Sequence, residues 1–260
     1  MVTEVPCRTA LSKSRIYGVD FSLNPYFGCE HSCVYCYVPR IMSNRLKGRA
    51  WGSFIEVKVN IPKILSRELK RVARGRVLLS SITDPYQPVE RLYGLTRKCI
   101  ELLAKRGLEI VVLTKSSTFT RDLELMDKEN FEIGVTVTTL RFYEELEPKA
   151  HHPLERLKAL SKASEQGFKT FLFLGPLLPG IVDEEIREIL ELACTSGVRY
   201  VIVDRLNTKG DVVQAIASAL KSHCLDKLFK ALSDWGWLGS IRSKIVDLCK
   251  RLGISCDFCF

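Results

Sequence analysis

Residues 24–37 read NPYFGCEHSCVYCY, and this stretch places three cysteines in a Cys-x3-Cys-x2-Cys spacing. Cys29, Cys33 and Cys36 must meet at one centre, because a loop of eight residues cannot hold their thiols far apart. Thiolates are ligands for zinc and for iron–sulfur clusters. A structural zinc takes four protein ligands, and His31 is the only nearby candidate for the fourth. An iron–sulfur cube held by three thiolates leaves one iron open to a substrate or cofactor, and packing cysteines without metal are a third alternative.

Beyond this stretch, short apolar runs alternate with amphipathic stretches. We expect a strand before Asn24 and further strands at Arg76–Ser80, Glu109–Thr114, Glu132–Thr138, Lys169–Leu174 and Arg199–Asp204. We expect helices at Ile61–Arg74, Leu92–Arg106, Thr120–Asp127, Pro153–Gln166, Glu184–Thr195 and Asp211–Leu220. Continuous apolar strands between helices predict an α/β fold with a parallel sheet. An open sheet and a barrel fit this pattern equally, and in both the functional residues gather at the carboxyl ends of the strands.

The chain divides into three parts on this pattern. Residues 15–222 hold six strand-and-helix units, and residues 1–14 precede them as an N-terminal extension. Residues 223–260 follow as a C-terminal appendage, in which the strand pattern stops. Asp226–Trp235 and Ser240–Leu252 have helical periodicity. We therefore expect one α/β domain with a helical, cysteine-containing extension.

The charge of the chain is uneven. Residues 1–76 contain 14 basic and five acidic residues, whereas residues 77–260 contain 25 of each, so the net charge of +9 belongs to the first third. A localised basic surface favours a polyanion such as nucleic acid, although a solvated face of lysine and arginine gives the same count. The longest apolar run, Phe171–Val182, is too short to span a bilayer. With no targeting segment, we expect a soluble cytoplasmic protein without a membrane partner.

The cysteine triplet, with aromatic Tyr35 just before its last member, resembles the motif of the radical S-adenosylmethionine superfamily. The flanking NPYFGC and YCY sequences resemble the spore photoproduct lyase-related branch of that superfamily. The same branch is matched by SSITDPYQPVE at residues 80–90, LTKS at 113–116 and PLLPG at 176–180. The resemblance covers about residues 18–205 and recurs at successive strand ends, which a chance cysteine triplet would not do.

The superfamily fold is a partial (β/α)6 barrel of the TIM type, with a [4Fe–4S] cluster and S-adenosylmethionine as cofactors. The resemblance implies that Cys29, Cys33 and Cys36 are the iron ligands. It also implies that the open iron takes the amino and carboxylate groups of S-adenosylmethionine. The expected activity is one-electron cleavage of this cofactor to a 5′-deoxyadenosyl radical, with an electron donor such as flavodoxin or ferredoxin.

The resemblance further implies which side chains bind S-adenosylmethionine. Tyr35 would lie near the adenine. Ser81, Thr83 and Asp84 occupy the place of the family's glycine-rich motif, which contacts the methionyl ammonium. Asp84 and Glu90 have an alternative role as caps of the following helix, where carboxylates are favoured.

Further candidate residues follow other expected strands and the cysteine triplet itself. Lys115 would neutralise the methionyl carboxylate, and a surface lysine is the alternative. Thr136 or Thr138 would hydrogen-bond the ribose. Tyr37 is a candidate catalytic residue that could relay a hydrogen atom, and a packed aromatic is the alternative.

One position departs from the enzyme that gives the branch its name. Spore photoproduct lyase uses a cysteine at the end of the second strand as a hydrogen donor, and Ser81 stands there in this chain. A serine O–H bond is too strong to replace a thiol in that role. This departure argues against the spore-lesion activity, so the resemblance implies a relative of unknown substrate.

The basic first third predicts a nucleic-acid substrate that is repaired or modified. Four cations directly after the cysteine triplet are the candidates for phosphate contacts: Arg40, Arg45, Lys47 and Arg49. Two alternatives stay open. One is radical modification of a peptide or small molecule, and the other is a non-catalytic, zinc-binding nucleic-acid-binding protein.

The tail carries a second group of cysteines. Cys249, Cys256 and Cys259 follow a Cys-x6-Cys-x2-Cys spacing, and Cys7 or Cys224 could supply a fourth thiolate. Some superfamily members carry an auxiliary iron–sulfur cluster after the barrel. The tail therefore suggests an auxiliary cluster or a zinc site, with a disulfide or free thiols as alternatives.

Overall fold

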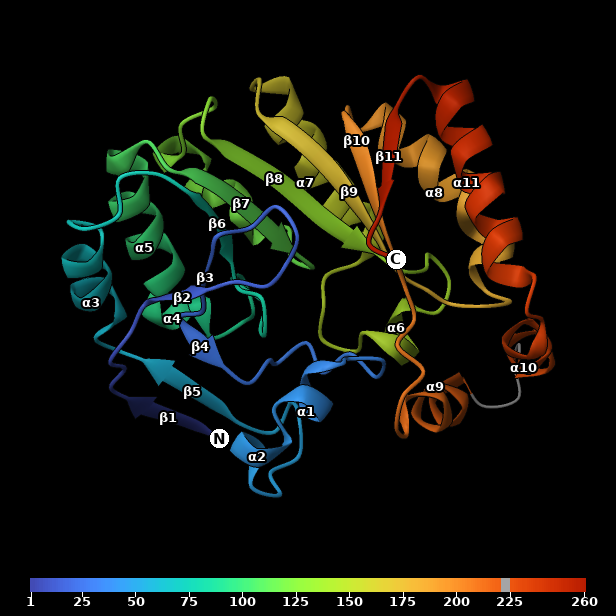
Figure 1. Cartoon of the computed structure of the whole chain (residues 1–260), viewed down its shortest axis with the longest axis horizontal. Helices are drawn as coiled ribbons and strands as arrows, with labels where there is room; N and C mark the ends of the chain where they lie inside the picture. The colour runs from blue at the N-terminus through green and yellow to red at the C-terminus, as the bar shows by residue number, and fades with distance from the viewer. Residues whose placement is uncertain (221–224) are drawn as a thin grey trace.

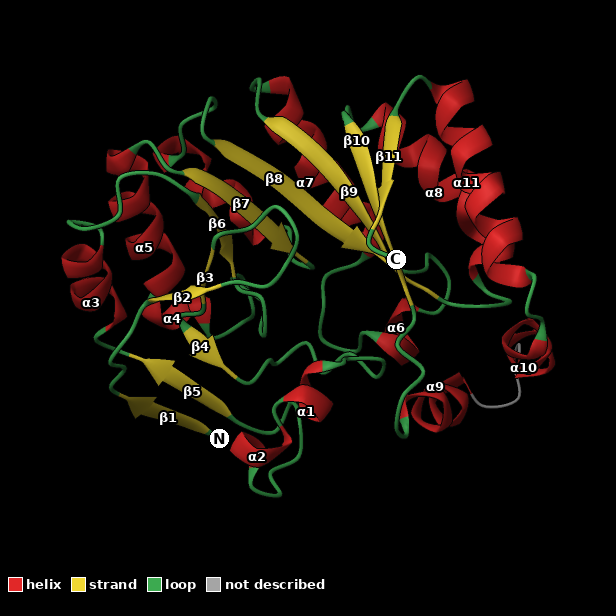
Figure 2. Ribbon diagram, viewed as in Figure 1, coloured by secondary structure: helices red, strands yellow, loops and turns green. Residues whose placement is uncertain are grey.

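A computed structural model describes residues 1–220 and 225–260, and its main feature is a curved sheet with helices on the outer face (Figures 1 and 2). From one edge to the other, the strands are β11 (Ser255–Phe258), β10 (Tyr200–Arg205), β9 (Lys169–Leu177), β8 (Phe131–Val137), β7 (Glu109–Thr114), β6 (Arg76–Leu79), β3 (Phe21–Leu23) and β2 (Leu11–Lys13). The pairs from β11 to β3 are parallel, and β2 runs antiparallel to β3. This sheet confirms the expected α/β fold and contains all six expected strands.

The two faces of the sheet bury different side chains, because successive residues of a strand point to opposite faces. In β8, Ile133, Val135 and Val137 pack into the main core with the helices. Phe171 of β9 belongs to a separate cluster on the concave face. An added Cβ on Gly134 would lie 2.3 Å from the Phe171 ring, so only glycine fits there. Apolar side chains thus fill the inside of the barrel below the carboxyl ends of its strands.

Five helices pack on the main core: α3 (Ile61–Glu68), α5 (Leu95–Leu103), α7 (Pro153–Glu165), α8 (Val182–Thr195) and α11 (Trp237–Leu252). The other helices are α1 (Val38–Ile41), α2 (Ser43–Leu46), α4 (Glu90–Tyr93), α6 (Tyr143–Leu146), α9 (Val212–Leu220) and α10 (Leu225–Ser233), with 3-10 helices at Ala104–Arg106 and Thr118–Leu125.

Three expected helices differ from the structure. The helix expected at Ile61–Arg74 ends at Glu68. The helix expected at Leu92–Arg106 divides at Gly94, whose φ of +59° ends α4. The helix expected at Thr120–Asp127 is largely 3-10 in geometry.

The N-terminal residues take part in both sheets. β1 (Val2–Val5) pairs in parallel with β5 (Ile55–Lys58), which pairs with β4 (Tyr26–Phe27) in a small second sheet. Residues 1–14 also contribute β2 to the edge of the large sheet. The N-terminal extension expected at residues 1–14 therefore contributes strands to both sheets. Its boundary at residue 14 stays a prediction.

The C-terminal segment corrects one expectation. The strand pattern does not stop at Asp226, because β11 follows α11 and pairs in parallel with β10, Ser255 opposite Tyr200. The strand escapes notice in the sequence because it is only four residues long and its residues, Ser-Cys-Asp-Phe, are not a continuous apolar run. The expected domain boundary at 222 and the candidate ligand Cys224 fall outside the described residues. Within residues 1–220 and 225–260, no helix is long and apolar enough to cross a membrane.

Candidate active site

The cysteine loop follows β4 and runs into α1 at the carboxyl end of the barrel. It starts at Gly28, whose φ is +93° and whose added Cβ would lie 2.3 Å from the carbonyl oxygen of Phe54. Only glycine can therefore make this turn against the backbone of the neighbouring segment. Cys29 is buried, and Cys33 and Cys36 are partly buried.

The three thiols lie in one electrostatic environment. Burial raises the pKa of Cys29 well above its usual range, and the charges of Asp84, Cys33 and Cys36 add to this effect. Burial also raises the pKa of Cys33 to about 12, against the lowering effect of Lys115. The effect of Cys33 and Cys36 on Cys29 agrees with three thiols near one another, and their role as cluster ligands stays a prediction.

The donor set of the loop is three thiols, from Cys29, Cys33 and Cys36. Thiolates bind iron–sulfur clusters and zinc, and a structural zinc takes four protein ligands. His31, the expected fourth zinc ligand, is buried with Nδ1 3.4 Å from the Asp84 carboxylate. The three thiols therefore suit an iron–sulfur cube, and the Cys3His zinc centre stays an alternative prediction.

Asp84 holds the loop after β7 in place. Its Oδ1 accepts hydrogen bonds from Thr114 Oγ1 at 2.6 Å and from the N–H of Tyr86, and its Oδ2 accepts from the N–H of Lys115 at 2.8 Å. Burial opposes its charge, but the facing His31 and these donors lower the pKa of Asp84 to about 2. The carboxylate thus positions Lys115, and its expected contact with a methionyl ammonium stays a prediction.

The segment around Ser81 and Thr83 packs directly against the cysteine loop. Thr83 Oγ1 donates to the carbonyl of Gly28 at 2.5 Å, and the carbonyl of Ser81 accepts from the Tyr37 hydroxyl at 2.8 Å. These contacts place both candidate cofactor residues beside the thiols. Glu90 caps a helix, which is the alternative role expected for it. Its carboxylate accepts hydrogen bonds from the N–H groups of Thr96 and Arg97 at the start of α5.

A buried ionic network lies behind Tyr35. The Tyr35 hydroxyl hydrogen-bonds to Glu147 and, at 2.9 Å, to Thr138 Oγ1. Arg156 is fully buried and pairs with the other oxygen of Glu147. The Arg156 guanidinium also donates to the carbonyl of Thr136 at 2.9 Å. Both expected threonines therefore lie in this network, Thr138 through its side chain and Thr136 through its backbone.

Lys115 faces the thiols and this network. Its Nζ lies 5.5 Å from the centre of the Tyr35 ring. Burial opposes its charge, but the negative charges of Cys33 and Glu147 raise the pKa of Lys115. Lys115 is partly buried, and its role towards the methionyl carboxylate stays a prediction. Sequence reasoning missed Glu147 and Arg156, since neither follows a strand or belongs to a motif.

Tyr37 stands at the rim of the site. Its side chain is 43% exposed, so it is not a packed core aromatic. Burial of its hydroxyl, together with the charges of Cys36 and Asp204, raises the pKa of Tyr37 to about 12. A neutral hydroxyl at the rim is compatible with the expected relay of a hydrogen atom, which stays a prediction.

The candidate phosphate contacts are exposed but not equivalent. All four belong to α1, α2 and the turns that follow: Arg40, Arg45, Lys47 and Arg49. Arg45 and Arg49 both pair with Glu56, at 2.9 and 2.7 Å. Their guanidinium groups also stack on Phe27 and Phe54, at 3.8 and 3.9 Å from the ring centres. These two arginines therefore have a structural role in addition to any contact with nucleic acid.

The cysteines of the tail lie in different surroundings. Cys249 is buried against the main core, where burial and the adjacent Cys256 raise its pKa to about 12. Cys259 is exposed beyond β11, and partial burial of its thiol and the charge of Asp204 raise its pKa. The auxiliary cluster or zinc site expected at Cys249, Cys256 and Cys259 stays a prediction.

The fold and the three-thiol site define a class of protein. The sequence model of the Radical SAM superfamily matches residues 23–193, which include the cysteine loop and the strands from β6 to β9. The chain belongs to the radical S-adenosylmethionine superfamily. Its membership makes it an enzyme and implies a [4Fe–4S] cluster and S-adenosylmethionine as cofactors.

The relatives place it near spore photoproduct lyase. The solved structure of that enzyme with a dinucleoside spore photoproduct superposes with a TM-score of 0.76 at 14% identity, over 99% of this chain and 82% of the other. An uncharacterized protein of Methanocaldococcus jannaschii is 30% identical over 187 residues, 71% of this chain and 70% of the relative. A radical SAM Nalpha-GlyT isomerase of Pseudomonas phage M6 is 26% identical over 185 residues, 69% of this chain and 38% of that protein. The branch expected from the sequence is thus confirmed.

Proposed function

We propose that Cys29, Cys33 and Cys36 hold a [4Fe–4S] cluster whose open iron binds S-adenosylmethionine, and that the enzyme modifies or repairs a nucleic acid. The single observation that supports the cluster assignment is that one buried and two partly buried thiols of the same short loop lie near the Lys115 ammonium. When bound and reduced, the cluster supplies the electron that cleaves S-adenosylmethionine to methionine and a 5′-deoxyadenosyl radical. The residues of the chain bind the cofactor, orient it and exclude water.

Those residues bind and orient the cofactor. Lys115 presents a buried positive charge that suits the methionyl carboxylate, and the Asp84 carboxylate fixes its backbone. Tyr35 presents a ring beside this lysine, and Glu147 holds the phenol in one orientation. Thr138 Oγ1 donates to the carbonyl of Gly175 at 2.8 Å, and this hydroxyl would accept a hydrogen bond from the ribose. A site that is rigid and closed to water keeps a reactive radical from being quenched before it meets the substrate.

Two observations support a nucleic acid as the substrate. The positive excess of the chain lies in residues 1–76, which include the cysteine loop and the exposed Arg40 and Lys47. The similar fold of spore photoproduct lyase was solved with a dinucleoside ligand. A basic rim would bind phosphates and carry a base toward the radical. Arg45 and Arg49 would contribute less, because Glu56 offsets their charge.

A peptide substrate is the second candidate. Streptococcus suis SuiB was solved with its precursor peptide, and its fold superposes with a TM-score of 0.55 at 14% identity over 93% of this chain and 50% of the other. The basic rim favours nucleic acid over a peptide of ordinary composition. Binding should therefore weaken steeply with salt for nucleic acid, and a duplex, a single strand and tRNA compared at two salt concentrations would rank the substrates.

The activity test is the production of 5′-deoxyadenosine by the anaerobically reconstituted and reduced protein. Cys33→Ala should abolish both the product and the visible absorbance of the cluster. Cys194→Ala is a matched control, because Cys194 lies in α8, outside the site. Unchanged production by the Cys33 variant would remove the cluster from the mechanism. One equivalent of zinc in place of iron would favour the non-catalytic alternative.

A further inference from the structure

His151 lies in the segment between α6 and α7, directly beside the candidate active site. Its backbone N–H donates to the carbonyl of Lys115 at 3.2 Å, and its own carbonyl accepts from Arg156 Nε at 2.6 Å. Both partners belong to the site described by the cysteine loop and the network around Tyr35. The fold therefore sets the position of the His151 imidazole relative to the site.

The hydrogen bonds of this imidazole identify the nitrogen that carries its proton. Nδ1 of His151 lies 3.0 Å from the backbone nitrogen of Ser117, whose N–H can only donate, so Nδ1 is the acceptor. The Ser117 hydroxyl, 2.6 Å from the same nitrogen, can donate to it as well. Burial and the charge of Arg91 lower the pKa of His151, which favours the neutral ring. A neutral imidazole has a single N–H, and in His151 it must therefore be on Nε2.

The Nε2–H group of His151 meets a second donor instead of an acceptor. The Arg91 guanidinium on α4 lies 3.5 Å from Nε2, and a guanidinium accepts no hydrogen bond. Arg91 is exposed and forms no salt bridge with a carboxylate of the described residues. Arg45 and Arg49 differ in this respect, because both are paired with Glu56. Two N–H donors thus converge on a point where the described part of the chain supplies no acceptor.

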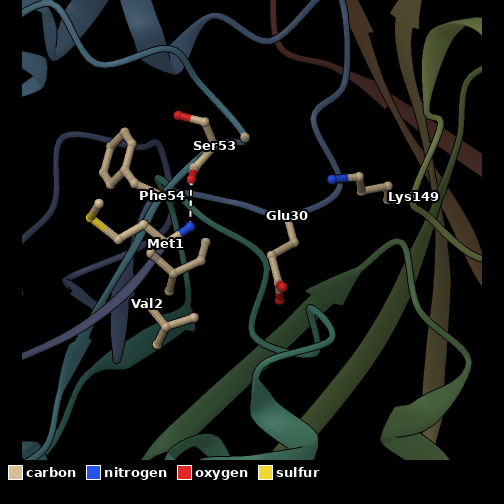
Figure 3. Close-up of a pocket in the computed structure, with 8 residues that line it drawn as sticks. Met1, Val2, Glu30, Ser53, Phe54 and Lys149 are labelled. Atoms are coloured by element: carbon tan, nitrogen blue, oxygen red, sulfur yellow. Dashed lines mark hydrogen bonds between the residues drawn. The ribbon is translucent and has the colours of Figure 1, made fainter.

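Converging donors of this kind suit an oxygen of a phosphate group, for which arginine is a preferred partner. The pair lies close to the cysteine loop, because the N–H of Val89, just before α4, donates to Glu30 at 2.6 Å. Lys149, which is exposed two residues before His151, adds a further positive charge. Lys149 also lines a pocket of about 240 Å³ and lies across it from Met1, with Glu30 between them (Figure 3). A phosphate between the two donors would therefore be held beside the site and near a second cation.

We propose that Arg91 and His151 together bind one backbone phosphate of the nucleic-acid substrate, with one oxygen accepting from the Arg91 guanidinium and from the His151 Nε2–H. This inference rests on the proposed function. The charge count does not predict the contact, because residues 77–260 contain equal numbers of basic and acidic residues. A phosphate contact positions the strand without reading its sequence. Arg91 and His151 are thus substrate-binding residues outside the basic first third of the chain.

The first test is the binding of a fluorescein-labelled single strand of about 20 thymidines to the reconstituted protein, followed by fluorescence anisotropy at several salt concentrations. Arg91→Gln should weaken binding about tenfold and reduce the dependence of log K on log salt by about 0.7, the value for one phosphate of a single strand. Arg251→Gln removes an equal charge from the exposed surface of α11, and its affinity should stay within about twofold of the wild type. Equal effects of the two variants would overturn the inference.

A double variant tests whether the two side chains share one phosphate. His151→Asn keeps an acceptor for Ser117 and removes the Nε2 donor, so it should weaken binding about fivefold. Because both donors bind the same phosphate, the double variant should bind within about twofold of Arg91→Gln alone. Effects of the single variants that multiply in the double variant, or no effect of His151→Asn, would refute the shared contact.

A second measurement uses the wild-type protein and does not depend on a variant that binds. Long-range 1H–15N nuclear magnetic resonance of protein labelled with 15N-histidine should show His151 as the Nε2–H tautomer, with its signal assigned by its absence from His151→Asn. The oligonucleotide should move this signal, and inorganic phosphate is the control for a small-anion site. An Nδ1–H tautomer, or a signal that the oligonucleotide does not move, would refute the inference, whatever the effect of inorganic phosphate.

The same experiments distinguish this contact from the proposed function. If the wild type binds no nucleic acid at low salt, the proposed substrate class fails together with the contact. If the wild type binds and Arg91→Gln binds equally well with the same salt dependence, only the contact fails.

Discussion

Replacing Arg156 by methionine should destabilise the apo protein strongly, because the change strands a buried carboxylate. Arg156 is fully buried, and it binds Glu147, the carbonyl of Thr136 and the carbonyl of His151. Glu147 is only 1% exposed, so water cannot replace the lost guanidinium. Breaking a buried pair on one side costs about 3–5 kcal/mol. With a urea dependence of about 2.5 kcal/mol per M, the unfolding midpoint should fall by about 1–2 M.

The assay is urea unfolding of the reduced apo protein, followed by circular dichroism. The double variant Glu147→Gln, Arg156→Met removes both charges and should recover at least about 1 kcal/mol relative to Arg156→Met. Arg141→Met is the surface control, because Arg141 pairs with the exposed Glu184, and it should cost less than about 1 kcal/mol. A loss below about 1 kcal/mol in Arg156→Met, or a double variant no more stable than the single one, would refute the reasoning.

Two further predictions follow from the fold. Burial and the nearby Arg91 lower the pKa of His151, whose Nδ1 accepts a hydrogen bond from the N–H of Ser117. The folded protein therefore favours the neutral imidazole. Because the unfolded chain binds a proton more readily, the free energy of unfolding should fall as the pH drops below about 6.5. The urea midpoint of the wild type should be lower at pH 5.5 than at pH 7.5, and this difference should be smaller in His151→Asn. An equal difference in the two proteins would contradict the prediction. Gly134→Ala should lower the free energy of unfolding by about 1–3 kcal/mol, because the added methyl group overpacks Phe171. Gly239→Ala in α11 should raise it by about 0.5–1 kcal/mol, because the space around Gly239 is open. Thermal unfolding of the two variants, ranked against the wild type, tests the contrast.

The large sheet could be predicted from the sequence, because its strands are buried on both faces and therefore appear as continuous apolar runs. β7 occupies the expected residues, Glu109–Thr114. β11 could not be predicted, because the four residues Ser255–Phe258 are too short a segment to show a strand pattern. The segment Thr118–Leu125 was expected to be an α-helix, since a short apolar stripe does not distinguish α from 3-10 geometry. The pairing of β1 with β5 joins strands that are far apart in the sequence, so no local sequence pattern predicts it.

The site was predictable where its residues follow strands or share a motif. Lys115 and Thr138 both lie beside Tyr35 of the cysteine loop, because the carboxyl ends of parallel strands lie at one edge of the sheet. Glu147 and Arg156 were not predictable, since one lies after α6 and the other on α7, and only the tertiary fold joins them. The sequence also could not distinguish a phosphate-binding arginine from one stacked on Phe27, because both are exposed cations on a short helix.

The most direct test of the account is electron paramagnetic resonance of the reconstituted, reduced wild-type protein before and after addition of S-adenosylmethionine. Three thiolates and an open iron predict a reduced [4Fe–4S] signal that changes when the cofactor binds. Cys29→Ala, Cys33→Ala and Cys36→Ala should each lose the signal, and Cys194→Ala should keep it. A signal that S-adenosylmethionine leaves unchanged, or a cluster that survives loss of any of the three cysteines, would contradict the central claim.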